Sequence, residues 1–418
     1  MELFNKSQIE KEIKELPGGS LNILLDIAYS ANIKSIAIVG GIVRDLITKS
    51  KNKDYNIIFN DLDLIIEGDV IKYVEELQKV LGIDRVQIIR NNTSYKTSEV
   101  IINGVKVDIA SAREEKYPIP GENPLVKSST INNDLIRRDF NINAMAIDLK
   151  DNKLIDLFSG LDAISNMKID FLHELSVLED PTRIIRAARY SARLGFNLSS
   201  QALTQIQKTI DSWPWYWHNG DKLNLVPSAL SIRLRMELEL LFKSKDWKNA
   251  LKNLQEWGAL KIIDSNLQDD HNLLDKIFRA KNSNIEALTA FVYESHNPLY
   301  LAERLKISTQ QKEIIEGAYQ LNKHLNNIEV NRLYKNWSPS KWTTFLEEIN
   351  VDQSSFILEI CRENPLKKYL SSWLYNWKNI ESPIKGDDLI AKGWKPGPDL
   401  GIEIRRQRMK LIDEQNRI

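Results

Sequence analysis

The sequence predicts an α+β protein, with a small head of mixed sheet and helices followed by an all-helical remainder. Between residues 34 and 149, short apolar runs rich in β-branched residues alternate with helical stretches. After residue 162, strand patterns nearly vanish and the i, i+3, i+4 rhythm of amphipathic helices takes over. Only 17 glycines and 13 prolines occur in 418 residues, and such scarcity favours long helices over a strand-and-turn fold.

The expected elements follow in chain order. Residues 1–30 form one or two amphipathic helices, with a break and an N-cap at Gly18-Gly19-Ser20. The head is expected to contain strands at 35–40, 61–68, 86–89, 99–102 and 105–110, and helices at 42–49 and 70–81. The later helices are clearest in the segments 182–196, 228–242, 246–263 and 355–364.

Composition excludes several classes of protein. The 57 basic and 57 acidic residues cancel, which excludes a histone-like coat of charge but not nucleic-acid binding, because that affinity follows local Lys and Arg placement. The single cysteine, Cys361, excludes an internal disulfide framework and is interpreted as a small buried apolar residue. The charged N-terminal segment does not fit a signal peptide, and no apolar run approaches the roughly 18 residues of a membrane span. We therefore expect a cytoplasmic protein.

Two segments of the head carry candidate phosphate contacts. Gly40 and Gly41, between an apolar strand and a helix, would let a phosphate approach the backbone and the free N–H groups of the helix start. A structural tight turn explains these glycines equally well. Arg44 adds a forked donor on the first helical turn. Arg137 and Arg138 either bind phosphate or pair with nearby acids.

Asp61 and Asp63 form a candidate metal site. Residues i and i+2 of a strand face the same side, roughly 6.5–7 Å apart, so the two carboxylates repel each other unless a cation lies between them. Mg²⁺ binds through one or two carboxylates plus substrate phosphates. A solvated strand face is the alternative interpretation. Asp108 either adds a third carboxylate from a neighbouring strand or is an ordinary surface residue.

The segment 179–196 predicts a cationic helix. Its acidic start and early proline are typical of a helix N-terminus. Arg183, Arg186, Arg189 and Arg193 recur at spacings of three, three and four, which aligns them on one face. Because adjacent like charges destabilise an isolated helix, we expect an anionic partner, with a solvated basic face as the alternative. The acidic pair and these arginines would then form complementary walls of one cleft.

Together these motifs resemble the class II tRNA nucleotidyltransferases. This family comprises the CCA-adding enzymes, relatives that add only CC or only A, and the bacterial poly(A) polymerases. The motifs that carry the resemblance are GGIVRD (40–45), DLD (61–63), RRDFNINAMA (137–146), DLFSG (156–160) and EDPTRIIRAARYSARLGF (179–196). The segments SIRLRMELELLF (231–242) and GWKPGPDLG (393–401) are similar to a further motif and to a C-terminal turn of some members.

The resemblance implies an architecture and an activity. It implies a polymerase-β-like nucleotidyltransferase head with N-terminal helices (1–165), a neck with a nucleotide-selecting helix (166–245), a body (246–385) and a tail that contacts tRNA (386–418). The implied activity is template-independent transfer of CMP, AMP or both from CTP or ATP to the 3′ end of tRNA by a two-metal mechanism with Mg²⁺. No membrane partner is implied.

The resemblance also assigns residues. Asp61 and Asp63 correspond to the catalytic metal ligands. The implied nucleotide contacts are Gly41, Arg44, Arg138, Glu179, Asp180, Arg183, Arg186 and Arg189. Within this set, Glu179, Asp180 and Arg183 resemble the template that reads the incoming base. Asn141 stands where the family usually has threonine, and we expect this exchange to modulate function rather than abolish it.

Alternatives stay open at this stage. A poly(A) polymerase shares every head motif, and an inactive RNA-binding module could use the same scaffold, although the intact aspartate pair speaks against decay. The segment 113–138 lacks the paired-arginine RRP stretch of all-in-one CCA enzymes and is more similar to the CC-adding and A-adding branch. The aromatic run at 213–217 either stacks on nucleotides or packs between neck and body. The basic residues at 405–410 either contact tRNA phosphates or form a solvated face.

Overall fold

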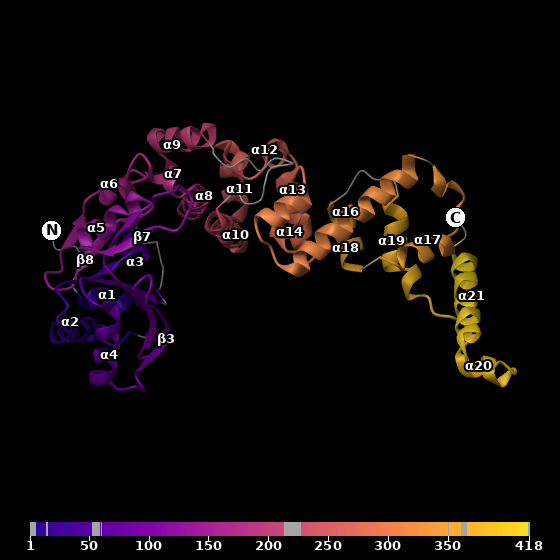
Figure 1. The fold of residues 1–418 in the computed structure, drawn as a ribbon, viewed down its shortest axis with the longest axis horizontal. Helices are drawn as coiled ribbons and strands as arrows, with labels where there is room; N and C mark the ends of the chain where they lie inside the picture. The colour runs from indigo at the N-terminus through magenta and orange to yellow at the C-terminus, as the bar shows by residue number, and fades with distance from the viewer. Residues whose placement is uncertain are drawn as a thin grey trace. The chain divides into compact units, whose positions relative to one another are not determined.

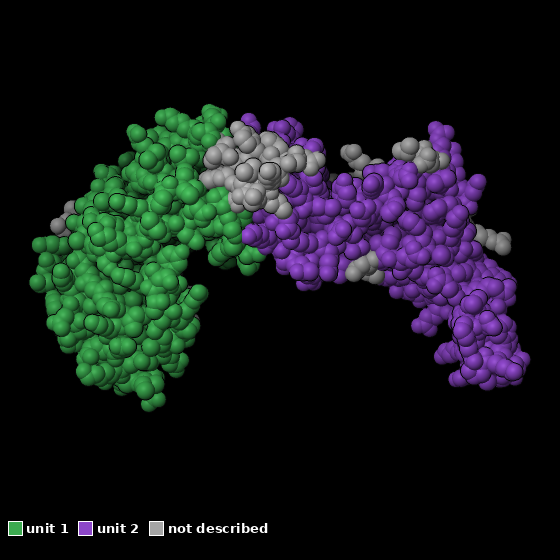
Figure 2. Space-filling view, viewed as in Figure 1, with its two compact units in different colours: residues 1–214, 226–259 green, residues 215–225, 260–418 purple. Residues whose placement is uncertain are grey.

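The computed structural model describes residues 6–13, 16–51, 59, 61–212, 227–330, 332–349, 351–360 and 366–416. Cys361 and the aromatic run at 213–217 lie outside the described residues. The chain forms two compact units, residues 1–214 with 226–259 and residues 215–225 with 260–418 (Figure 2). The expected division into head, neck, body and tail stays a prediction. In the part of the chain that the structure describes, no helix is long and apolar enough to cross a membrane.

A seven-stranded sheet organises the first unit (Figure 1). Its strand order is β3-β4-β5-β2-β1-β8-β9, and β2 and β5 run parallel while the other neighbouring pairs are antiparallel. The strands are β1 (Ile36–Val39), β2 (Asp61–Ile66), β3 (Val86–Asn92), β4 (Thr97–Ile102), β5 (Val105–Ser111), β8 (Met145–Asp148) and β9 (Leu154–Asp156). Two small sheets pair β6 (Arg113–Lys116) with β7 (Leu125–Ser128) and β10 (Lys168–Ile169) with β11 (Asn197–Leu198).

Helices cover both faces of this sheet. The helices of the first unit are α1 (Lys6–Glu12), α2 (Ser20–Ser30), α3 (Gly41–Lys51), α4 (Val70–Leu81), α5 (Ile131–Ile136), η1 (Asn141–Asn143), α6 (Gly160–Ser165), α7 (Ser176–Glu179), α8 (Thr182–Leu194), α9 (Ser200–Asp211), α10 (Ser228–Lys243) and α11 (Trp247–Glu256). Helix α3 packs on β1, β2 and β8, and α4 packs on β3, β4 and β5. On the opposite face, Ile131 and Leu135 of α5 pack with Ala37, Ile65 and Ala146. Because side chains alternate along a strand, Asp61 and Asp63 share this second face with Ile65.

The pattern-based expectations for the head are confirmed for its most regular elements. The five expected strands are β1 to β5, and the two expected helices are α3 and α4. The N-cap of α2 differs from expectation, because Gly19, with φ of 84°, occupies that position and Ser20 begins the helix. The capping carboxylate comes from buried Glu10, which accepts hydrogen bonds from the backbone N–H groups of Gly19 and Leu21, both at 2.7 Å.

The remainder is helical, as the sequence predicts. In the first unit, α10 and α11 both pack on α8, so the expected neck–body boundary at 245–246 falls between two helices of one unit. Within the described residues of the second unit, the elements run from η3 (Ala259–Ile262), which begins at the unit boundary, through α12 (Ser265–Asp269), α13 (Leu273–Asn282), α14 (Ala287–Tyr293), α15 (Pro298–Arg304), α16 (Thr309–Val330), η4 (Leu333–Asn336), α17 (Pro339–Leu346), α18 (Val351–Ile360), α19 (Lys367–Tyr375), η5 (Trp377–Asn379) and α20 (Gly386–Ala391) to α21 (Pro398–Gln415). Its core includes Trp342, and the ring of the partly buried Tyr369 stacks on it with centroids 4.7 Å apart.

Candidate active site

Three carboxylates from two neighbouring strands form what we call the acidic wall: Asp61, Asp63 and Asp108. Asp61 and Asp63 lie two residues apart on β2, and Asp63 is the register partner of Asp108 on β5. The third carboxylate considered from the sequence is therefore present in the structure. Burial, followed by the charges of Asp61 and Asp108, raises the pKa of Asp63 to about 6, against the opposing effects of Arg138 and Lys106. Such mutual repulsion is relieved by a cation.

The carboxylate oxygens of the acidic wall are suitable ligands for a hard divalent metal ion. The protein supplies only some of the ligands that such an ion needs. Among the described residues, no three His, Cys, Asp or Glu side chains group closely enough to hold a metal ion by themselves. Lys106 Nζ lies 3.7 Å from Asp108 Oδ2 and 2.9 Å from Glu99 Oε1, so it already supplies one positive charge beside Asp108. Asp61 and Asp63 match the one or two carboxylates through which Mg²⁺ binds when phosphates complete its coordination.

The glycine turn, Gly40 and Gly41, presses against the acidic wall where β1 enters α3. Gly40 has a φ of 81°, in the left-handed region. A Cβ at this position would lie 2.8 Å from Asp63 Oδ2, so the backbone approaches the carboxylate more closely than any side chain allows. At Gly41, a Cβ would lie 3.3 Å from Arg44 Nη2. Both glycines therefore serve close packing as well as the turn.

Arg44 lies behind the site rather than on its surface. Its side chain is 1% exposed. Its Nε donates to Asp45 Oδ1 and its Nη1 to Asn143 Oδ1, both at 2.7 Å. The guanidinium carbon also lies 5.2 Å from the ring centroid of Tyr190. The structure thus gives Arg44 a positioning contact with Asn143 and Tyr190, and its expected phosphate contact stays a prediction.

Helix α8 supplies the arginine wall, which consists of Arg183, Arg186 and Arg189. Arg186 donates to Asp139 Oδ2 at 2.6 and 2.9 Å and to Glu237 Oε1 at 3.0 Å. Arg189 pairs with the other oxygen of Glu237. Burial opposes ionisation of Asp139, yet Arg186 and a hydrogen bond from Asn143 hold its pKa below the ordinary value. Part of the anionic partner expected for the arginine stripe is therefore the protein itself.

Asp180 and Arg183 lie at the start of α8 and are held by backbone and hydroxyl groups. Asp180 Oδ1 accepts from Thr182 N at 3.2 Å and from Thr182 Oγ1 at 2.7 Å, so it hydrogen-bonds the first residue of the helix. Arg233 Nη2 lies 3.6 Å from the same oxygen. Arg183 donates to the carbonyl of Arg137 at 2.9 Å and to the hydroxyl of Ser176. These contacts fix both side chains before any ligand binds.

Arg137 and Arg138 pair with nearby acids, which was one of their two expected roles. Arg137 Nε lies 2.8 Å from Asp134 Oδ1, and Arg138 Nη2 lies 3.3 Å from Asp134 Oδ2. Arg137 also donates to Glu115 at 3.1 Å. The carboxylate of Asp134 is fully buried, so it anchors both arginines from below. Arg138 remains available to the cavity described next.

A cavity of about 500 Å³ in the first unit brings the glycine turn, the acidic wall and the arginine wall together. The sequence-predicted residues that line it are Gly40, Gly41, Asp63, Arg137, Arg138, Asp180, Arg183 and Arg186. Those that do not line it are Arg44, Asp61, Asp108, Glu179, Arg189 and Arg193. The acids and arginines therefore do face one cavity, as expected for complementary walls, although each wall contributes only part of its residues.

Sequence reasoning missed several residues of this cavity, namely Tyr117, Tyr190, Asp139, Arg233 and Glu237. Arg233 and Glu237 lie in the quoted segment 231–242, and Asp139 in the segment 137–146, so the motifs marked the segments but not the side chains. Tyr117 follows a charged strand that no hydrophobic pattern reveals. These residues become visible only when the segments fold together.

Glu179 and Asn141 have local partners outside the cavity. Glu179 Oε2 lies 3.5 Å from His173 Nε2. Burial and Arg183 lower the pKa of His173, so this contact joins a neutral imidazole to the acid near neutral pH. Asn141 Oδ1 accepts from the backbone N–H groups of Ile142 at 2.8 Å and Asp170 at 3.1 Å. The asparagine therefore supports the backbone around the site.

The fold and the cavity define a class of protein. A mixed sheet that presents paired carboxylates beside a strand-to-helix glycine turn, followed by an arginine-bearing helix, is a nucleotidyltransferase head. Residues 36–170 match the family model described as the poly A polymerase head domain. Over these residues the chain therefore matches the nucleotidyltransferase head domain that its motifs predicted. Enzymes of this family typically use divalent metal ions.

Individual relatives agree with this assignment. The A-adding tRNA nucleotidyltransferase of Aquifex aeolicus is 27% identical over 90% of this chain and 45% of its own length. The CC-adding tRNA nucleotidyltransferase of Deinococcus radiodurans is 31% identical over 54% of each protein. The chain thus spans about half the length of either relative. An apo structure of a CCA-adding enzyme has a TM-score of 0.70 at 23% identity, covering 98% of this chain and 95% of that one, and shows the shared fold.

Proposed function

We propose that this protein transfers AMP, CMP or both from ATP or CTP to the 3′ end of tRNA without a nucleic-acid template. The observation that carries the proposal is the single cavity that joins the glycine turn, the acidic wall and the arginine wall. The Aquifex A-adding relative aligns with 90% of this chain, against 54% for the Deinococcus CC-adding relative. A CCA-adding enzyme of Pediococcus pentosaceus aligns with the same 90% of the chain at a lower identity of 23%, against 27% for the A-adding relative, so we propose the A step, in which one AMP completes a tRNA ending in CC.

The two ends of the cavity are assigned to different parts of the incoming nucleotide. We assign the triphosphate to the glycine turn and Arg138, where backbone N–H groups at the start of α3 and a guanidinium favour an anion. Asp61 and Asp63 would hold Mg²⁺, which when bound neutralises charge on the reacting phosphoryl group. The tRNA 3′-oxygen forms the new bond to the α-phosphorus, and the bond to the β-phosphate oxygen breaks to release pyrophosphate. Positioning and charge then dominate catalysis.

We assign the base end to Asp180 and Arg183. Asp180 Oδ1 is occupied by Thr182, whereas Oδ2 makes no hydrogen bond within the described residues and can accept from an amino group. Cytosine and adenine each present an exocyclic amino donor beside a ring-nitrogen acceptor. Uracil and guanine present a carbonyl where the carboxylate needs a donor. The pair therefore admits C and A and rejects U and G.

A product gel tests the proposal. Purified protein with Mg²⁺ is given tRNA ending at the discriminator base, at C or at CC, with CTP or ATP supplied separately. We expect one AMP on the CC-ending substrate. Addition of CMP to the shorter substrates would assign the CC step as well. No extension of any substrate would overturn the proposal.

Poly(A) polymerase activity is the second candidate, favoured by the description of the matching head-domain model. The same gel distinguishes it. A poly(A) polymerase extends an unstructured RNA with a long ladder of adenylates, whereas a tRNA-specific enzyme stops after completing the CCA end. We expect the short product only.

A further inference from the structure

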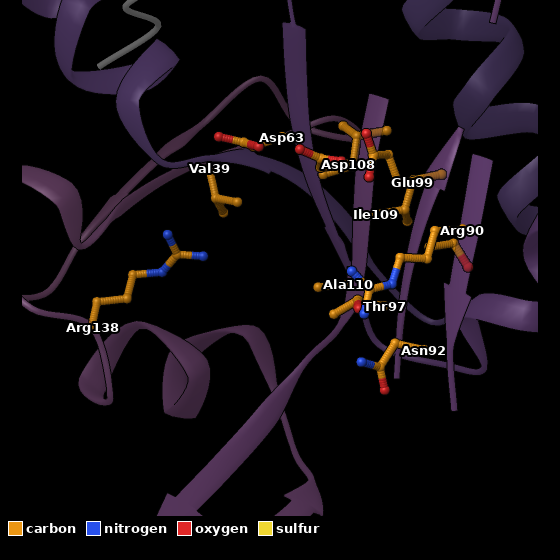
Figure 3. A pocket seen from close by; sticks show the side chains of 12 residues that line it. Val39, Asp63, Arg90, Asn92, Thr97, Glu99, Asp108, Ile109, Ala110 and Arg138 are labelled. Carbon is orange, nitrogen blue, oxygen red and sulfur yellow. The ribbon is translucent and has the colours of Figure 1, made fainter. Parts of the chain in front are cut away.

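We call the cavity of about 500 Å³, to which we assign the incoming nucleotide, the nucleotide cavity. A second cavity, of about 450 Å³, adjoins it and shares Asp63 and Arg138 with it. It lies over β2, β5, β4 and β3, whereas the glycine turn of the nucleotide cavity follows β1. The second cavity also touches Val39 of β1, but most of its lining residues belong to β3, β4 and β5, so it extends from Asp63 mainly toward the side of β2 away from the glycine turn. Figure 3 shows Arg138 and Arg90 on facing sides of the second cavity, each directed into the space between them.

Strand register aligns a row of charged side chains along this cavity. Arg90 of β3 pairs with Glu99 of β4, Glu99 pairs with Asp108 of β5, and Asp108 pairs with Asp63 of β2. All four residues line the cavity. The row therefore leads from the acidic wall to a single arginine on the edge strand.

A β-bulge places Arg90 in that row. Ile88 pairs with Val100, and regular antiparallel register would then put Ile89 opposite Glu99. The register shift between Ile88 and Arg90 puts Arg90 there instead, while Ile89 is left 54% exposed. Bulges beside active sites re-aim side chains in this way. The cationic end of the cavity is thus built by the backbone.

The chemistry of the proposed transfer, on which this inference rests, assigns the occupant. In an in-line displacement, the attacking and leaving oxygens lie on opposite sides of the phosphorus. A nucleotide bound on the β1 side of Asp63 leaves the β5 side for the attacking 3′-hydroxyl. That side is where the second cavity lies.

We propose that the second cavity holds the single-stranded 3′-terminal nucleotide of the acceptor RNA and that Arg90 binds the phosphate on its 5′ side. Three inter-strand steps of about 4.8 Å separate Arg90 from Asp63 at their Cα atoms, roughly 14 Å in all. An extended arginine side chain covers about half of that span. The remainder matches one nucleotide from its 3′-oxygen to its 5′-phosphate. A planar guanidinium is suited to bidentate contact with that phosphate.

The next row of the same face supplies neutral polar groups. Asn92 of β3 pairs with Thr97 of β4, and both line the cavity. Their amide and hydroxyl groups can hydrogen-bond the sugar and base edge of the terminal nucleotide. The cavity thus has Arg90 at the end far from Asp63, the acidic wall at the other end, and neutral polar groups in the row beside them.

The first experiment compares Arg90→Ala with Arg85→Ala, which removes the same charge from an exposed position that lines neither cavity. We expect Arg90→Ala to lower kcat/KM for the acceptor RNA by roughly 10- to 100-fold, the effect of one charged hydrogen bond. Nucleotide affinity measured without RNA should stay unchanged, and Arg90→Lys should recover part of the loss. Weaker nucleotide affinity in Arg90→Ala would instead place the triphosphate in this cavity and overturn the proposal.

The second experiment asks whether Arg90 reads that particular phosphate. The last phosphodiester of the acceptor is replaced by a neutral methylphosphonate and tested with wild type and Arg90→Ala. We expect the neutral linkage to impair the wild type and to cost the variant nothing more. If the neutral linkage and Arg90→Ala each lower kcat/KM independently, so that the combined loss is the product of the two single losses, the proposal is overturned. A wild type that extends no acceptor refutes the proposed function, whereas an active wild type with Arg90→Ala equal to Arg85→Ala refutes this inference alone.

Discussion

The two walls of the nucleotide cavity differ in how far the protein itself compensates their charges. In the arginine wall, the chain supplies acids, because Asp139 and Glu237 bind Arg186 while Glu237 also binds Arg189. In the acidic wall, three carboxylates lie on two neighbouring strands with Lys106 beside Asp108, and the pKa of Asp63 rises to about 6 through burial and its acidic neighbours. The arginine wall is therefore largely neutralised within the fold, whereas the acidic wall keeps an excess of negative charge.

This difference indicates what each wall does. Arginines that are already hydrogen-bonded are held in place and can present their remaining N–H groups to a base or phosphate without reorganising. Carboxylates kept close despite their repulsion store a preference for a cation that arrives with the substrate. The arginine wall should therefore determine which nucleotide is selected and contribute to the stability of the fold. The acidic wall should determine the rate of nucleotide addition.

The largest expected effect comes from neutralising the acidic wall. Asp63→Asn keeps the size of the side chain and removes its charge, so nucleotide addition should fall by about 10³-fold or more while the fold survives. The rate is measured under saturating Mg²⁺ and substrate, with circular dichroism as the check on folding. Near-normal turnover of a folded variant would show that the acidic wall is not catalytic.

The next effect concerns selection by the arginine wall. Arg183→Ala should lower kcat/KM most for the cognate nucleotide and so narrow its preference over UTP and GTP, by roughly 5- to 150-fold for one bidentate contact. The measurement is kcat/KM for each of the four nucleotides on one tRNA. Parallel losses for all four would mean that Arg183 only stabilises the structure through its contacts with Arg137 and Ser176.

Much of the fold could be predicted because its inner strands alternate buried apolar residues with polar ones. In β2, for example, the buried residues Leu62 and Leu64 alternate with Asp61 and Asp63. The hairpin of β6 and β7 could not be predicted, since β6 is the charged run REEK. Strand β8 was not predicted, because its four residues, Met145–Asp148, are too short a run to show a strand pattern.

The residues of the candidate site also fall into those that could be predicted from the sequence and those that could not. Spacing alone places Asp61 with Asp63 and aligns the arginines of α8, because these are local relations. The partners of those arginines could not be predicted, since Glu237 is separated from Arg186 by 51 residues and meets it only through helix packing. The β-bulge that turns Arg90 into the second cavity is likewise set by pairing between strands.

A smaller effect is expected from uncoupling the arginine wall from its internal partner. Glu237→Gln removes the charge shared by Arg186 and Arg189, and we expect the free energy of unfolding to fall by about 1–3 kcal/mol, less than for a fully buried pair because Arg186 is partly exposed. The matched control is Glu239→Gln on the same helix, whose partner Arg235 lies 3.6 Å away. It should change stability by less than about 0.5 kcal/mol. Equal stability of the two variants would contradict an internally neutralised wall.

The smallest expected effect is the pH dependence that Asp63 gives to stability. Its folded pKa of about 6 exceeds the ordinary value of 3.8, so the folded carboxyl holds its proton at pH values where the unfolded one has lost it. The ionised form is thus penalised only in the folded state, and that cost grows as pH rises from about 4 to 6 and then stays constant.

In protein stripped of metal, Asp63→Asn should melt at nearly the wild-type temperature near pH 4. Above pH 6 it should melt several degrees higher. Added Mg²⁺ should shrink the difference by binding the wild type. Asp84→Asn, at an exposed position outside the wall, serves as the control. A difference that does not change between pH 4 and pH 7 would show that the acidic wall carries no stored repulsion, and the contrast between the two walls would fail.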